Sequence, residues 1–169
     1  MIKKKIIPVF LASVLTLSGT AGFMTGMLQE NVYAAEEIHT ERLADFADLL
    51  DDDQEEELEA KLDQVSEDYN CDVVVITEES IDGATPVDYA DDFFDYNDYG
   101  MGDDKSGILF LITMSERKWC ISTHGEAIQI FTDAGQKYMT DSFVSYLSDG
   151  EYYEGFMKFA DLCEEFIIQ

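Results

Sequence analysis

Carboxylates are the most numerous groups in this sequence that could do chemistry. The 169-residue chain has 37 Asp and Glu residues against 10 Lys and Arg residues. Carboxylate oxygens are hard ligands that suit Ca²⁺ or Mg²⁺. The twelve-residue calcium loop does not occur, because a frame that begins at Asp51 has Glu56 where glycine is needed and Leu62 where the bidentate glutamate belongs. A calcium site would therefore need ligands from separate segments of the chain.

Three aspartates in separate acidic segments are the candidate metal ligands. Asp45 lies in a short apolar and acidic segment, 43–50. Asp103 and Asp104 lie in a loop rich in turn-forming residues, 97–107, which leads into an apolar strand. We expect these acidic positions to bracket the sheet, and Asp45 and Asp104 to converge on one calcium ion. For each aspartate taken alone, a solvated loop position is the alternative.

The sequence lacks the groups that common phosphatase mechanisms need. A cysteine nucleophile requires an arginine shortly after it, but the sixth residues after Cys71, Cys120 and Cys163 are threonine, glutamate and glutamine. An aspartate nucleophile in a D-x-D-x-[TV] motif is also missing. A metal-assisted acid phosphatase, in which carboxylates such as Asp45 and Asp104 hold the ion, remains the alternative to a non-enzymatic function.

Nucleotide and transition-metal sites are disfavoured as well. The chain has no G-x-x-x-x-G-K-[ST] loop, and Gly100-Met101-Gly102 is followed by Lys105 where a dinucleotide motif needs its third glycine. His39 and His124 form no H-E-x-x-H pair, and no two cysteines are close enough in sequence for a structural zinc site. We therefore expect neither a nucleotide nor a transition-metal cofactor.

The first 34 residues have the three parts of a secretory signal. Lys3-Lys4-Lys5 is basic, residues 6–17 are apolar, and residues 32–34 form a small-residue exit. Cleavage after Ala34 would leave a linker, 35–42, and a domain, 43–169, on the extracytoplasmic side. An uncleaved membrane anchor is the alternative, because no charged residue occurs from Ile6 through Leu28.

The domain expected after cleavage is strongly acidic. The leader contains three of the 10 basic residues and one of the 37 acidic residues, so 7 and 36 remain, a formal charge of −29. Such a surface repels nucleic acid and anionic lipid headgroups and attracts cations. The high content of hydrophobic residues, 46%, indicates a folded domain and not an acidic disordered tail.

Hydrophobic periodicity and capping residues predict the elements that position these groups. Continuous apolar runs indicate buried strands, and apolar residues at helical spacing after Asp51, Thr85 and Thr132 indicate capped helices. The first predicted helix is followed by a strand, a helix, two strands and two helices. This order predicts a three-layer α/β sandwich in which the last two strands form a hairpin. The expected helices cover 51–69, 86–96, 132–149 and 152–167, and the expected strands cover 72–77, 108–113 and 118–123.

The cysteines are better suited to packing than to chemistry. Cys71, Cys120 and Cys163 are an odd number without regular spacing, so at least one thiol stays unpaired. Cys120 and Cys163 lie inside apolar runs, where a buried cysteine acts as a small hydrophobic residue.

From about Arg42 to Ile168 the sequence resembles the TPM domain family, and most closely its Gram-positive bacterial type. The ordered segments that carry this resemblance are 44–50, 72–77, 88–94, 100–112, 119–123, 131–135 and 147–152. The chain departs from the family pattern at Asp48, where the opening motif usually has glycine, and at His124, where relatives often have a small or neutral residue.

The resemblance implies a fold, a location and a function. It implies a Rossmann-like three-layer sandwich, with a mixed sheet and helices on both faces, on the extracytoplasmic side. It also implies calcium held in some members by acidic residues near the strand ends. We expect a secreted or cell-surface module that binds Ca²⁺ and contacts envelope or membrane proteins. The family carries a phosphatase label, so weak acid phosphatase activity is the alternative function.

Overall fold

The structure, a computed structural model, describes residues 41–169 as a succession of strands and helices. The predicted signal sequence, His39 and most of the predicted linker lie outside the described residues. The strands are β1 (Leu43–Asp45), β2 (Asp72–Glu78), β3 (Gly107–Thr113) and β4 (Lys118–His124). The helices are α1 (Asp52–Tyr69), α2 (Pro86–Tyr96), α3 (Ala127–Ile130), α4 (Asp133–Asp149) and α5 (Tyr152–Ile167).

The strands form one mixed sheet in the order β1-β2-β3-β4. β1, β2 and β3 run parallel, and β4 runs antiparallel to β3. Every residue of β3 is buried, as is every residue of β2 except Glu78. The two continuous apolar runs therefore form the central strands that the sequence predicts, since a strand covered on both faces needs no polar alternation.

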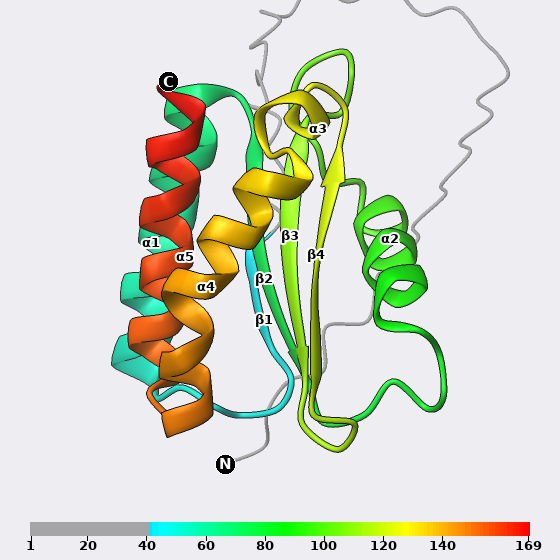
Figure 1. Ribbon diagram of the computed structural model, residues 1–169, viewed down its shortest axis with the longest axis vertical. Coiled ribbons are helices and arrows are strands. Elements are labelled where there is room, and N and C mark those ends of the chain that lie inside the picture. The colour runs from blue at the N-terminus through cyan, green and yellow to red at the C-terminus, as the bar shows by residue number, and fades with distance from the viewer. Residues whose placement is uncertain (1–40) are drawn as a thin grey trace, which may run out of the picture. The chain divides into compact units, whose positions relative to one another are not determined.

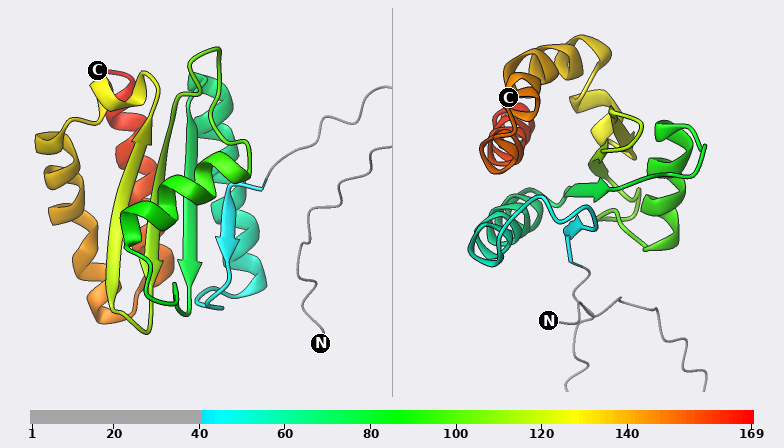
Figure 2. Two further views of the ribbon diagram at one scale, coloured as in Figure 1. Left: turned by 90° about the vertical axis from the view of Figure 1, so that its right-hand side faces the viewer. Right: turned by 90° about the horizontal axis from the view of Figure 1, so that it is seen from below.

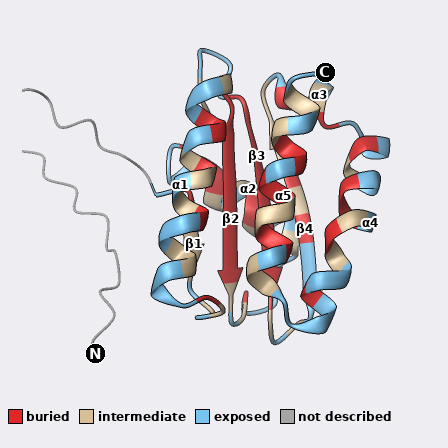
Figure 3. Ribbon diagram, turned by 90° about the vertical axis from the view of Figure 1, so that its left-hand side faces the viewer, coloured by how far each residue is buried: buried red, intermediate tan, exposed pale blue. Residues whose placement is uncertain are grey.

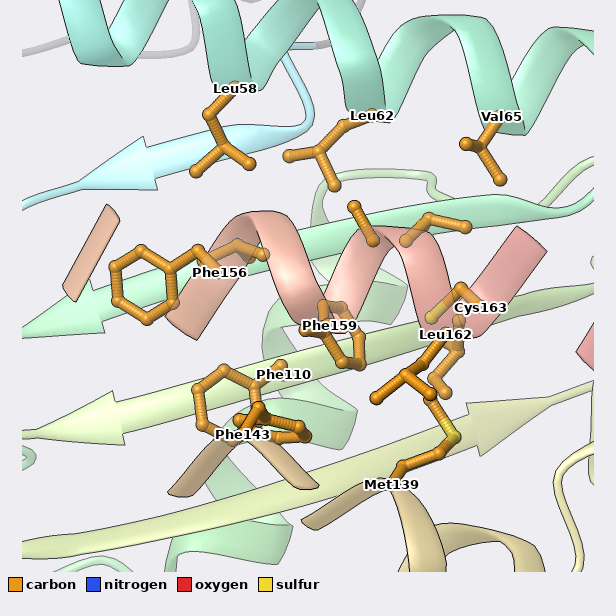
Figure 4. Packing of buried hydrophobic residues seen from close by; sticks show 14 of the residues in the cluster. Leu58, Leu62, Val65, Phe110, Met139, Phe143, Phe156, Phe159, Leu162 and Cys163 are labelled. Atoms are coloured by element: carbon orange, nitrogen blue, oxygen red, sulfur yellow. The ribbon is translucent and has the colours of Figure 1, made fainter. Parts of the chain in front are cut away.

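Helices cover both faces of the sheet and give three layers (Figures 1 and 2). The α1, α4 and α5 helices lie on one face, and α2 lies alone on the other. On the larger face the Phe110 ring of β3 meets Phe143 of α4 at 5.0 Å and Phe159 of α5 at 5.5 Å between ring centroids (Figure 4). On the α2 face Leu109 of β3 packs with Phe94. Successive side chains of a strand point to opposite faces of the sheet, so the same strands contribute residues to the hydrophobic cores on both faces.

The two βαβ crossovers have opposite hands. The steps from β1 to β2 and from β2 to β3 go the same way across the sheet, yet α1 and α2 cover opposite faces. Seen from the α2 face in Figure 2, the β2-α2-β3 crossover is right-handed, so β1-α1-β2 is left-handed. Left-handed crossovers are rare in sheets. The loops after β1 and β2 consequently leave toward opposite faces.

Helix ends follow the capping residues read from the sequence. Asp51 and Gln54 form a reciprocal capping box at α1, and the hydroxyl of Thr85 accepts a hydrogen bond from an N–H in the first turn of α2. Thr132 caps α4 in the same way, and Gly150 ends that helix with a φ of 83°. These local interactions explain why the predicted helices agree with the observed ones.

Two short elements are not predicted from the sequence. β1 has three residues, and α3 has four. Neither is long enough to show periodicity, and both are held by contacts with distant segments. The Ala127 N–H at the start of α3 donates to the Ser106 hydroxyl at 3.0 Å.

The helices turn their buried residues toward the sheet and their exposed residues outward (Figure 3). On α5 the buried set includes Phe156, Phe159 and Cys163. Cys71, Cys120 and Cys163 are all free and buried, which confirms the packing role predicted for Cys120 and Cys163. Within residues 41–169 no helix is both long enough and apolar enough to cross a membrane.

Candidate cation site

Asp45 lies at the edge of the sheet where the parallel strands end. One of its carboxylate oxygens accepts hydrogen bonds from the Leu49 N–H at 3.1 Å and from the Thr77 hydroxyl, and the other accepts one from the Leu50 N–H at 2.9 Å. Asp48 in this loop has a φ of 58°, a left-handed conformation that favours glycine. The Asp45 carboxylate therefore shapes the loop between β1 and α1.

Asp103 and Asp104 lie at the opposite edge, in the loop that leads into β3. An Asp104 carboxylate oxygen accepts a hydrogen bond from the Glu126 N–H at 2.6 Å, which ties this loop to the turn between β4 and α3. Asp103 is exposed, and within residues 41–169 its side chain makes no hydrogen bond or ion pair. One aspartate is thus fixed by backbone contacts, and its neighbour faces solvent.

Tight backbone geometry fixes the Asp104 loop. Met101 and Ser106 form an isolated antiparallel bridge, so the segment between them is a closed turn. A Cβ atom on Gly100, whose φ is 101°, would lie 2.6 Å from the Lys105 carbonyl oxygen. A Cβ atom on Gly125, whose φ is 58°, would lie 2.5 Å from the Asp104 carbonyl oxygen. Glycine is therefore required at both positions, because they combine positive φ with close backbone approach.

The structure does not bring Asp45 together with Asp103 and Asp104. Asp45 pairs with Thr77 near the end of β2, whereas the Asp104 loop enters β3 at Gly107, which pairs with Asp72 at the start of β2. Five residues of strand separate Thr77 from Asp72, which is about 16 Å at the usual rise. One ion cannot contact both groups, so the expected convergence of Asp45 and Asp104 is not found.

The Asp104 loop has oxygen donors of the kind that calcium uses. Asp104 and the Asn70 side-chain amide both lie over Gly102, since a Cβ atom there would be 3.3 Å from Asp104 Oδ1 and 2.8 Å from Asn70 Nδ2. The side chains of Asp103, which is next to Asp104 in the chain, and of Glu126, whose backbone N–H donates to Asp104, are exposed. No three His, Cys, Asp or Glu side chains in the described part of the chain already surround one point closely enough to hold a metal. The donors fit calcium chemically, but a complete ligand set would require side-chain movement.

The edge around Asp45 is also rich in carboxylates, and sequence reasoning missed them. Glu78 accepts a hydrogen bond from the Tyr89 hydroxyl, and Glu116 accepts one from the Ser80 hydroxyl at 2.7 Å. The other oxygen of Glu116 is buried and is the one buried side-chain oxygen or nitrogen within residues 41–169 that lacks a hydrogen-bond partner. These contacts join the loops after β2 and β3. The available signal was that each carboxylate directly follows or flanks a predicted strand.

The groups that phosphatase chemistry would need are committed elsewhere. Burial raises the pKa of the Cys71 thiol to about 11 and that of Cys120 to about 12, so neither is a thiolate at neutral pH. The Arg42 guanidinium is buried and pairs with Asp72 at 2.9 Å and with Asp63 at 2.5 Å. It therefore cannot clamp a phosphate without breaking two ion pairs.

Ser122, His124 and Asp91 lie together on the α2 face but do not form a catalytic triad. The Ser122 hydroxyl lies 2.5 Å from an Asp91 carboxylate oxygen and 2.9 Å from His124 Nε2. A triad needs the imidazole between the serine and the carboxylate, and here the serine lies between them. The His124 ring stacks on Phe94 at 3.8 Å, and burial lowers its pKa below the ordinary value. The cluster therefore fixes α2 against β4.

Comparison with known proteins agrees with this fold. A family model described as the TPM domain matches residues 43–166. The solution structure of the N-terminal domain of a protein from P. gingivalis is similar with a TM-score of 0.66 and 19% identity, over 75% of this chain and 82% of that one. The N-terminal domain of the cg2496 protein from Corynebacterium glutamicum is similar with a TM-score of 0.61 and 17% identity, over 78% of this chain and 83% of that one. The BA42 protein from Bizionia argentinensis is similar with a TM-score of 0.61 and 13% identity, over 70% of this chain and 81% of that one. No curated protein matches the sequence.

Proposed function

We propose that this chain, which belongs to the TPM domain family, is a secreted or cell-surface module that acts by binding and not by turnover. In this proposal it holds a divalent cation, Ca²⁺ in the first place, and contacts envelope or membrane proteins. The signal-like leader supports the extracytoplasmic location. The buried thiols of Cys71 and Cys120 and the ion-paired guanidinium of Arg42 support binding.

The Asp103-Asp104 loop is the observation that carries the cation proposal. Its backbone is fixed at Gly100 and Gly125, while the Asp103 carboxylate faces solvent. A preformed loop with one fixed carboxylate and one free to turn toward an ion suits weak calcium binding, and extracellular calcium modules have dissociation constants of about 0.1–1 mM. Asp45 is less suited to this role, because its oxygens already accept three hydrogen bonds.

A thermal melt tests the cation site. Calcium at about 10 mM should stabilise the fold by roughly 1.4–2.7 kcal/mol if the dissociation constant is about 0.1–1 mM. For a domain of this size that is a Tm shift of roughly 5–10 °C. MgCl₂ at the same ionic strength should produce a smaller shift, because magnesium dehydrates reluctantly and demands a tighter octahedron.

A pair of matched variants separates a specific site from charge screening. Asp104→Asn should remove most of the calcium-specific shift and keep the shift that any salt produces. Glu67→Gln, an exposed position on α1, changes the net charge equally and should keep both shifts. Equal shifts with calcium and magnesium in the wild type and in Asp104→Asn would contradict the site.

The alternative, a metal-assisted acid phosphatase, has a direct test of its own. We expect the purified chain to hydrolyse para-nitrophenyl phosphate no faster than background, with or without calcium or magnesium. Turnover that is lost in Asp104→Asn and kept in Glu67→Gln would favour the enzyme over the binding module.

A further inference from the structure

Aromatic side chains form a row beside the β1 edge of the sheet that is exposed at its two ends, Phe46 and Tyr96, and partly buried between them. The Phe46 ring, in the loop after β1, meets the Phe93 ring of α2 edge to face, with 6.2 Å between centroids. Tyr89 stacks on Phe93 at 6.3 Å, and Tyr96 follows Phe93 by one helical turn on the same face of α2. We call these four residues and their acidic neighbours Asp88 and Asp92 the aromatic–acidic surface; α2 faces the viewer in Figure 2, left.

The two ends of this aromatic row are exposed to solvent. Phe46 is 56% exposed and Tyr96 is 85% exposed, while Phe94 on the opposite side of α2 is buried. A single exposed apolar residue is ordinary, but exposed rings on two elements, joined by the partly buried rings of Tyr89 and Phe93, are typical of contact sites. The α2 helix thus buries Phe94 in the core and leaves part of its other side open to solvent.

Acidic residues dominate the charge around the row, and Lys105 pairs with Asp98 at 2.8 Å just beyond the end of α2. Residues 43–60 and 62–104 contain no lysine or arginine, so both segments that form the surface are free of basic groups. Asp88 and Asp92 are exposed and four residues apart on α2, a spacing at which like charges repel. The last turn of α2 has no basic residue, so the negative end of the helix dipole near Tyr96 adds to this potential.

We propose that the aromatic–acidic surface docks a basic amphipathic segment of a partner protein. The inference rests on the protein-contacting role proposed above and names the surface and the partner chemistry for it. Apolar side chains of the partner would cover Phe46 and Phe93, and its lysines or arginines would pair with Asp88 and Asp92 or lie over the ring of Tyr96. Such a partner relieves both the exposure of the rings and the repulsion of the aspartates.

Peptide titration tests this surface in the full chain. The probe is a labelled 16-residue peptide of four Arg-Leu-Leu-Arg repeats, and its control has serine at every leucine position. Fluorescence anisotropy near physiological salt, where the screening length is about 8 Å, suppresses long-range attraction to the acidic protein. We expect the leucine peptide to bind at least about tenfold more tightly than the serine peptide.

Two pairs of variants locate the binding. Phe46→Ser with Tyr96→Ser should weaken the leucine peptide about tenfold, whereas Ile128→Ser with Tyr138→Ser, which removes exposed apolar side chains from α3 and α4, should not. Asp88→Asn with Asp92→Asn should weaken it more than Glu56→Gln with Glu67→Gln, exposed α1 positions that change the net charge equally.

Each possible result decides for or against the surface. No binding, equal binding of both peptides, or equal loss in the matched variants would overturn the proposal. Binding of phosphatidylcholine vesicles that is lost in Phe46→Ser with Tyr96→Ser, without peptide binding, would assign the surface to lipid and also overturn it. Calcium-specific stabilisation is measured separately on the Asp104 loop, so failure here leaves the cation proposal intact.

Discussion

Many side chains in this domain are committed to the core or held by polar contacts, and Cys163 is the simplest case. It is fully buried on α5 beside Phe159 and Leu162 (Figure 4). Burial raises its pKa well above the ordinary thiol value. A neutral thiol without access to solvent packs as a small apolar group and does not react.

Replacing Cys163 with alanine should therefore affect stability and leave function unchanged. We expect a loss of about 1–2 kcal/mol in the free energy of unfolding, from the lost packing. Urea denaturation gives the stability, and calcium-dependent Tm shifts give the binding. Wild-type stability together with lost calcium or peptide binding would show that the thiol has a functional role.

Glu78 gives a residue-level prediction with a pH dependence. Burial raises its pKa, and the hydrogen bond from Tyr89 opposes this effect only in part. Between the ordinary glutamate pKa and this raised value the folded state binds the proton more tightly than the unfolded state, so stability falls as pH rises through that interval.

Glu78→Gln should remove this loss while it still accepts a hydrogen bond from Tyr89. The variant should therefore gain stability relative to the wild type as pH rises above about 4.5, up to a plateau beyond the raised pKa. Denaturation at a series of pH values measures the difference. The exposed Glu56→Gln serves as the matched control, and a pH-independent difference for Glu78→Gln would contradict the argument.

At the scale of elements, the connections decide where functional groups lie. The turn between β4 and α3 is held against the Asp104 loop by the Glu126 N–H and by the close approach of Gly125. The turn at Gly83 also has positive φ, at 88°, but nothing lies within 4 Å of the position that its Cβ atom would take. A substitution at Gly83 therefore introduces backbone strain alone, whereas a substitution at Gly125 introduces the same strain and a steric clash.

Gly125→Ala should destabilise the domain more than Gly83→Ala. The left-handed conformation costs an alanine about 1–2 kcal/mol at either position. At Gly125 the clash with Asp104 should bring the total to about 2–4 kcal/mol, because the loop must shift. Urea denaturation of both variants measures the difference. Equal losses of stability in the two variants would show that the Asp104 loop shifts at no cost and is not held rigidly.

The long elements could be predicted from the sequence, and the short ones could not. Continuous apolar runs identify β2 and β3, and the capping residues Asp51, Thr85 and Thr132 identify three helices. The structure confirms the α/β fold and its mixed sheet. β1 has too few residues for a pattern, and its pairing with β2 depends on contacts more than 30 residues apart, such as that between Asp45 and Thr77.

The sequence names candidate ligands but does not give their arrangement. Asp45 is the last residue of a strand, whereas Asp103 and Asp104 precede one, and in parallel strands these positions lie at opposite ends of the sheet. Without β1 recognised as a strand, this argument could not be made. The contacts of Glu78 and Glu116 between loops depend on tertiary packing, which no local pattern encodes.

For the whole molecule, net charge dominates the solution behaviour. The full chain has a formal charge of −27 at pH 7. Repulsion among exposed carboxylates disfavours the compact state, and salt screens it. Raising NaCl from about 10 mM to about 500 mM shortens the screening length from about 30 Å to a few ångströms, so the Tm should rise. A Tm that falls or stays constant would mean that local ion pairs such as that between Arg42 and Asp72 outweigh the general repulsion.

The central claim is that the domain binds calcium at the Asp104 loop, and backbone amide NMR tests it most directly. During a CaCl₂ titration at constant ionic strength, we expect saturable shifts of the amide signals of Asp103, Asp104 and Glu126. The amides of Leu49 and Leu50, which donate to Asp45 at the opposite edge, should stay unchanged. Saturable shifts at Leu49 and Leu50 instead, or only uniform shifts that MgCl₂ reproduces, would contradict the claim.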